Sequence, residues 1–177
     1  MNRILPILVC LILFISSGLT RADEVVRPTA IQSSADSDWD FKQLTIEFLR
    51  ARSPGNRKFN LQAIERYYWN SNEFAGNGLP LKNSSLIGWE KYRDELSKDM
   101  SAFLQLTLLP NSADFKVQRR DATVSTRISF REVGKLLDGS RVDQTSDIQL
   151  EWRKVDDHWV IGRERILTPN EAEITSL

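Results

Sequence analysis

The chain has 177 residues, the length of one ordinary domain, and this predicts a single hydrophobic core. An apolar fraction of 41% and a charged fraction of 27% are close to globular averages, so they exclude a largely disordered chain and a protein with many membrane spans. The 24 basic and 24 acidic side chains balance, and this neutrality argues against a general nucleic-acid binder, which needs a surplus of positive charge.

The N-terminus departs from this composition. Residues 1–22 contain one early arginine, an apolar run from Ile4 to Ile15, and small or polar residues that end at Ala22. This layout is typical of a cleaved secretory signal peptide, and the apolar run is too short to cross a bilayer of about 30 Å comfortably. We therefore expect an exported protein, periplasmic or secreted, without stable membrane insertion after cleavage. The alternative is an uncleaved N-terminal membrane anchor.

Few residues suited to metal binding are present. Cys10, the only cysteine, lies inside the predicted signal peptide, so the mature chain has no thiol or disulfide chemistry. The single histidine, His158, stands beside Asp156 and Asp157 in a predicted turn and is interpreted as a solvated turn residue. We therefore expect no metal and no cofactor.

Helical patterns fill the first part of the domain. After a polar, flexible leader at residues 23–36, apolar residues recur at helical spacing from Trp39 to Leu49, with Ser37 among the possible N-caps. The helix-breaking sequence Ser53-Pro54-Gly55 is predicted to end this helix. A short second helix is predicted over residues 61–69, and residues 70–83 are predicted to form a loop. A third helix is predicted from Ser84 or Ser85 to Phe103.

Strand patterns fill the remainder. The alternation predicts strands over Leu104–Leu109 and Asp114–Arg120, followed by three strands within Asp121–Leu167 that are joined by turns at residues 138–139 and 156–157. One face of these three strands is expected to pack on the core. Its members are Ala122, Val124, Thr126, Ile128, Phe130, Ile148, Leu150 and Trp152.

Helices followed by a meander of long strands indicate the α+β class. The pattern of Trp39–Leu49, the motif IERYYW at Ile64–Trp69, the motif GWEKYRDEL at Gly88–Leu96 and the final hairpin at Asp138–Ile166 carry a family resemblance. The sequence resembles the nuclear transport factor 2-like superfamily, in particular its SnoaL-like branch, over residues 37–168. A C-terminal tail at 169–177 lies beyond this region.

The resemblance implies a cone-shaped, cystatin-like fold, in which N-terminal helices pack on a strongly curved antiparallel sheet and leave a pocket between the layers. The superfamily includes isomerases, dehydratases, cyclases and noncatalytic binding domains, so the fold does not select a function. Aromatic rings with a polar edge suit a small ligand cavity, although plain core packing is the alternative for each of them. The pocket candidates are Tyr67, Tyr68, Trp69, Trp89, Tyr92, Trp152 and Arg163.

Charged residues leave several alternatives open. Asp40, Glu47 and Glu164 are the carboxylates that can face inward, where an apolar pocket raises a carboxyl pKa, but solvated or ion-paired placement is the favoured interpretation of each. Five arginines on neighbouring strands predict either a cross-strand charge ladder, a homodimer interface on the sheet face, or a contact with an anionic ligand. They are Arg127, Arg131, Arg153, Arg163 and Arg165. Asn83 begins a glycosylation sequon that matters only in a eukaryotic source.

The sequence lacks an evident catalytic set, which favours binding over catalysis. The leading hypothesis is an exported single-domain protein that binds a small apolar or amphipathic molecule in the cone, as a homodimer. The alternatives are a cofactor-independent lyase or isomerase that uses a buried carboxylate and a tyrosine hydroxyl, and a protein-binding or assembly module.

Overall fold

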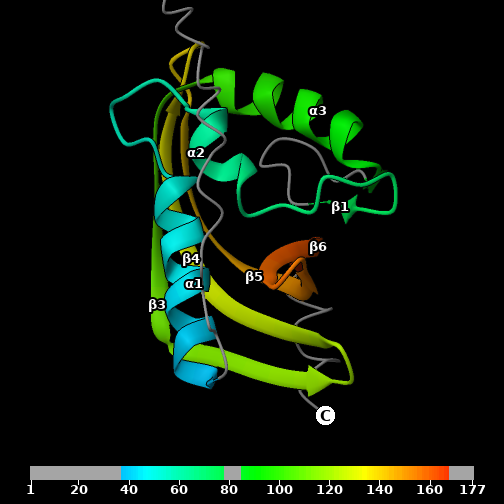
Figure 1. The fold of residues 1–177 in the computed structure, drawn as a ribbon. Helices are drawn as coiled ribbons and strands as arrows, with labels where there is room; N and C mark the ends of the chain where they lie inside the picture. Colours follow the sequence, from blue (N-terminus) through cyan, green and yellow to red (C-terminus); the bar gives the residue numbers. More distant parts are fainter. Residues whose placement is uncertain (1–36, 78–84, 168–177) are drawn as a thin grey trace, which may run out of the picture.

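The computed structural model describes residues 37–77 and 85–167 (Figure 1). The predicted signal peptide, the leader, the sequon asparagine and the C-terminal tail lie outside these residues. None of the helices in the described part is long and apolar enough to cross a membrane.

The first helix, α1 (Asp38–Ala51), begins where its sequence predicts. The Ser37 side chain accepts a hydrogen bond from the Asp40 backbone, and the Asp40 carboxylate accepts one from the Ser37 backbone, so the two residues form a capping box. The helix ends immediately before the predicted Ser-Pro-Gly punctuation. Its buried side chains follow the helical period, which turns one stripe of α1 toward the sheet.

The next two helices are shorter than predicted. Helix α2 (Leu61–Glu65) ends early, because Tyr67 and Tyr68 pair with the sheet instead: the Ile161 backbone N–H donates to the Tyr67 carbonyl at 2.7 Å. Helix α3 (Trp89–Ser101) starts later than predicted. The residues before it, β2 (Leu86–Ile87), pair with β1 (Ala75–Gly76), which lies within the predicted loop.

Six strands form one sheet in the order β2-β1-β6-β5-β4-β3. The three predicted strands of the C-terminal half are confirmed as β4 (Thr123–Leu136), β5 (Arg141–Val155) and β6 (His158–Leu167). The sheet is antiparallel except for the β1–β6 pair, which is parallel. The sequence predicted an antiparallel sheet and did not predict this short parallel pair.

The two strands predicted before Asp121 are one continuous strand, β3 (Phe103–Arg120). The pairing of β3 with β4 shifts register between Asn111 and Lys116, so Pro110-Asn111 disturbs the ladder without ending the strand. Proline is tolerated here because β3 is the edge strand of the sheet and needs no second ladder.

The predicted turns are confirmed by their backbone conformations. Gly139 has a φ of 90°, and Asp156 and Asp157 have φ values of 47° and 64°, which place both aspartates in the left-handed region that tight hairpins require. These turns fix the register of β4, β5 and β6. The register in turn decides which side chains face the helices.

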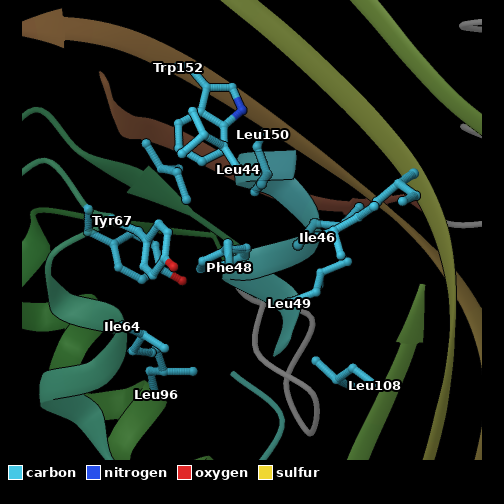
Figure 2. Packing of buried hydrophobic residues seen from close by; sticks show 14 of the residues in the cluster. Leu44, Ile46, Phe48, Leu49, Ile64, Tyr67, Leu96, Leu108, Leu150 and Trp152 are labelled. Atoms are coloured by element: carbon cyan, nitrogen blue, oxygen red, sulfur yellow. The ribbon is translucent and has the colours of Figure 1, made fainter. Parts of the chain in front are cut away.

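The hydrophobic core lies between the helices and the concave face of the curved sheet. Figure 1 shows α1 along β3 and β4, and α3 across the other end of the sheet. Side chains from α1, α2, α3 and the sheet converge on this interior (Figure 2). Seven of the eight residues predicted to face the core from the three C-terminal strands are buried, but Ala122 is exposed because it lies in the turn before β4. The architecture confirms the α+β class and the cone.

Candidate functional site

Five of the six aromatic pocket candidates lie in the core. They are Tyr67, Tyr68, Trp89, Tyr92 and Trp152, each at most 4% exposed. Trp69 is half-buried, and its ring lies 3.9 Å from the guanidinium carbon of Arg153. Arg163 is exposed on the outer face of the sheet, on the opposite side from these rings.

Trp152 is used by the core itself. Its indole Nε1 donates a hydrogen bond of 2.9 Å to Thr126 Oγ1, and the Thr45 hydroxyl bonds the same oxygen at 3.1 Å. Because both threonines are fully buried, this bond satisfies the only polar atom of the Trp152 side chain inside the protein. Hydrogen bonds from Trp152 of β5 and Thr45 of α1 to Thr126 of β4 therefore connect the helix to the sheet.

Tyr68 is the centre of a cluster of packed rings. Its ring stacks on Trp89 with centroids 4.5 Å apart and meets Phe74 edge-on at 5.5 Å. Phe48 of α1 and Tyr92 of α3 complete the cluster, at 5.6 Å and 5.9 Å from Tyr68. Rings from four separate parts of the chain thus pack against one another in the core at the α2 and α3 end.

A charged side chain from β6 lies among these aromatic rings. Glu164 has no exposed surface, and its Oε2 accepts a hydrogen bond of 2.5 Å from the Tyr68 hydroxyl. Its Oε1 accepts one of 2.9 Å from the Tyr92 hydroxyl and also bonds Nη1 of Arg52, the C-cap of α1, which is 3% exposed. We call Arg52, Tyr68, Tyr92 and Glu164 the polar cluster.

The electrostatics of the polar cluster keep its donors protonated. Burial, followed by the charge of Glu164, raises the pKa of Tyr68 and of Tyr92 well above the usual value. Burial by itself lowers the pKa of Arg52, but Glu164 and the two tyrosines outweigh it and raise that pKa well above its usual value. The cluster is therefore a fixed arrangement of two hydroxyls and an ion pair in an apolar interior.

A second carboxylate is buried on the same face of the sheet. Glu132 of β4 is 4% exposed, and its Oε2 accepts a hydrogen bond of 2.9 Å from the Gln144 side chain of β5. Its Oε1 has no hydrogen-bond partner among the described residues. Burial raises the pKa of Glu132, against the opposing effects of the Gln144 bond and the positive charge of Arg52. Glu132 therefore retains an acceptor for a further group.

Sequence reasoning identified Glu164 as a carboxylate that can face inward but missed Arg52 and Glu132. The spacing of Phe41, Thr45, Phe48 and Arg52 is i, i+4, i+7 and i+11, so continuing the apolar stripe by one turn places Arg52 toward the core. Glu132 likewise extends the inward alternation of β4 by two residues. The patterns contained both signals, but charged residues are usually assigned to solvent.

The other predicted carboxylates and arginines lie outside the core. Glu47 is exposed, and Asp40 belongs to the capping box of α1. On the outer sheet face Arg127 bonds Asp147 across β4 and β5, and Arg131 bonds Asp143 at 2.7 Å. These cross-strand pairs form a charge ladder. His158 is half-buried at the start of β6.

The arrangement of helices on the concave face of this curved sheet is the nuclear transport factor 2-like fold. The sequence matches no protein-family model, and no curated protein is significantly similar to it. Similar solved structures establish the fold.

One such structure is a nuclear transport factor 2-like superfamily protein from Salmonella enterica, with a TM-score of 0.61 and 15% identity over 75% of this chain and 94% of the other. A Catenulispora acidiphila protein in complex with S-DNPA has a TM-score of 0.56 and 12% identity, over 76% and 94%. A candidate dehydratase of the same fold family from Streptomyces avermitilis has a TM-score of 0.58 and 12% identity, over 73% and 95%.

Proposed function

We propose that this protein binds a small apolar or amphipathic molecule in its cone, and that the polar cluster recognises a polar group of that molecule. One observation carries the proposal: an ion pair and two tyrosine hydroxyls are buried inside an aromatic core. Buried ion pairs are weak stabilisers, because desolvation offsets their attraction, and apolar replacements are often as stable. A role in recognition accounts for a polar cluster that stability alone does not require.

The surroundings of the cluster support this proposal. Small-ligand sites are mainly apolar and aromatic, with a few polar groups that fix the orientation of the ligand. Phe74, Trp89 and Tyr68 supply such walls, and the Tyr68 and Tyr92 hydroxyls supply directed polar groups. The Catenulispora neighbour was solved in complex with S-DNPA, so a protein of this fold has been seen with a bound ligand.

A thermal-shift screen of aromatic and alicyclic compounds with one polar group tests the proposal, followed by calorimetric titration of the compounds that stabilise the protein. We expect Tyr68→Phe and Tyr92→Phe to weaken binding about tenfold each, the value of one hydrogen bond to a buried polar group. Tyr67→Phe is the matched control, since its buried hydroxyl contacts Arg66 rather than Glu164. A screen without any stabilising compound would refute the proposal.

A second candidate function, a cofactor-independent lyase or isomerase, is favoured by Glu132. Its raised pKa and its free Oε1 suit a group that exchanges a proton with a substrate, whereas three donors already occupy the oxygens of Glu164. The Streptomyces neighbour is a candidate dehydratase. The test is deuterium incorporation next to the carbonyl of 2-tetralone, followed by NMR. Exchange that is catalysed by the protein and lost in Glu132→Gln supports this function, and exchange at the solvent rate excludes it for this class of ketone.

The proposed assembly is a homodimer through the outer sheet face. Leu109 is 49% exposed and pairs across the edge of the sheet with Arg131, so an apolar group lies beside the charge ladder. Light scattering after size-exclusion chromatography should give a dimer that Leu109→Asp converts to a monomer. A wild-type monomer at high concentration would rule the dimer out.

The proposed export rests on the predicted signal peptide at residues 1–22. Expression with and without these residues, followed by cell fractionation and N-terminal sequencing, tests it. Export should require the segment, and the mature chain should begin after Ala22. Retention of the uncleaved chain in the membrane fraction would instead support the anchor.

A further inference from the structure

A groove of about 420 Å³ lies apart from the polar cluster, where the α1–α2 connection meets the end of α3. Its volume is within the range of pockets that hold small ligands. None of its lining residues belongs to the polar cluster. They are Asn56, Arg57, Lys58, Phe59, Met100, Ser101, Phe103, Leu104 and Leu137.

The floor and one wall of the groove are apolar and open to solvent. Leu104 is 51% exposed and Leu137 is 64% exposed, while Phe59 and Phe103 are half-buried beside them. The Leu137 backbone N–H donates to the Ala102 carbonyl at 2.9 Å, which holds the β4–β5 turn against the end of α3. Two large exposed apolar side chains that line one recess differ from apolar residues scattered singly over a surface.

The other side of the groove is cationic. Arg57 and Lys58 are exposed, and no ion pair joins either of them to an acidic residue in the described ranges 37–77 and 85–167. Among the residues that the structure describes, none that lines the groove is acidic. An apolar recess with two positive charges at its edge complements a molecule that has an apolar chain and a negative head group.

We propose that this groove binds a single-chain anionic amphiphile, such as an alkyl carboxylate, with the chain against Leu104 and Leu137 and the carboxylate near Arg57 and Lys58. A free single-chain molecule fits better than a lipid in a bilayer, because the apolar surface lies inside a recess of limited volume and only two cations flank it. This site is separate from the cone and does not depend on the function proposed for it.

Calorimetric titration of the mature protein with sodium decanoate, below its critical micelle concentration, tests the site. Decanol, with the same chain and no charge, and acetate, with the charge and no chain, are the matched probes. We expect decanoate to bind more tightly than either one, and added salt to weaken its binding but not that of decanol. Equal binding of decanoate and decanol would overturn the charge assignment.

Two pairs of substitutions locate the binding. Arg57→Gln with Lys58→Gln should weaken decanoate binding roughly three- to tenfold, the range expected for exposed charges. Leu104→Asn with Leu137→Asn should weaken decanoate and decanol alike. The charge-matched control is Lys91→Gln with Arg120→Gln, two exposed cations outside the groove lining, which should leave the affinity unchanged.

These variants alter exposed side chains, so the fold should persist, and circular dichroism checks that it does. If Arg57 and Lys58 serve only to neutralise the negative end of α3, their removal lowers the melting temperature and leaves decanoate affinity unchanged. That result would overturn the proposal. So would binding to anionic vesicles without binding to free decanoate, because the site would then recognise a membrane surface. Binding of decanoate in the cone would be lost in Tyr68→Phe rather than in the groove variants, and would also overturn it.

Discussion

Removing Arg52 from the polar cluster should destabilise the protein severely. In Arg52→Met the apolar side chain keeps much of the arginine volume, but Glu164 is left as a fully buried charge that retains only its hydrogen bonds from Tyr68 and Tyr92. Breaking a buried ion pair by removing one partner costs about 3–5 kcal/mol. Since the free energy of unfolding of a domain is about 5–15 kcal/mol, much of the stability should be lost.

A variant without any of the four polar groups gives the complementary result. Arg52→Met, Glu164→Leu, Tyr68→Phe and Tyr92→Phe together remove the ion pair and both hydroxyls, so no member of the polar cluster is left without the partner it had within the cluster. Replacement of a buried ion pair by apolar residues is neutral or stabilising by about 1–4 kcal/mol. The fourfold variant should therefore be at least as stable as the wild type, while losing the ligand binding proposed above.

Urea unfolding followed by circular dichroism and tryptophan fluorescence measures both effects, provided that the two probes give coincident transitions. The wild type, the single variant, the fourfold variant and Tyr67→Phe are compared at pH 7. The reasoning would be refuted if Arg52→Met cost less than about 1 kcal/mol. It would also be refuted if the fourfold variant were as unstable as the single one, because packing rather than charge would then explain the loss.

Three further predictions concern single positions. Burial raises the pKa of Glu132, so the wild type loses stability as the pH rises through that pKa and the buried carboxyl becomes charged. In urea unfolding, Glu132→Gln should therefore be more stable than the wild type by about 1 kcal/mol at pH 8 and no more stable at pH 4. Burial by itself raises the pKa of Asp147, but the hydrogen bonds that its carboxylate accepts, including those from Arg127, outweigh burial and lower this pKa. Asp147→Asn should therefore lose about 1–2 kcal/mol of stability at pH 7, and the loss should shrink as the pH falls through the lowered pKa. A difference that does not change with pH would contradict either assignment. A Cβ at Gly76 would lie 2.6 Å from the Tyr92 ring, so Gly76→Ala should cost about 1–3 kcal/mol, seen as a lower melting temperature, and an unchanged melting temperature would mean that the ring moves freely.

Local signals predicted most of the architecture. Helix α1 begins and ends where its cap and its Ser-Pro-Gly punctuation indicate, and the turns at residues 138–139 and 156–157 are as predicted. Alternation along β4 and β5 also identified the buried face correctly. These features depend on residues close together in the chain, so the sequence alone contains the information for them.

Pairing between distant segments was not predictable in the same way. The chain leaves α2 after Glu65 because the backbones of Tyr67 and Trp69 bond Ile161 of β6, almost a hundred residues later. Residues 75–76 become a strand because the same β6 offers them an edge. Local composition favours a helix that continues to residue 69 and a loop at residues 75–76, and only the folded sheet supplies the competing partners.

The polar cluster illustrates the division between the two kinds of information. Helical period and strand alternation are consistent with Arg52 continuing the inner stripe of α1 and with Glu164 on the inner face of β6, although sequence reasoning missed Arg52. Neither pattern predicts that the two side chains meet, or that two tyrosine hydroxyls donate hydrogen bonds to the carboxylate. That outcome depends on the curvature and register of the sheet, which bring residues 112 positions apart into direct contact in the buried interior.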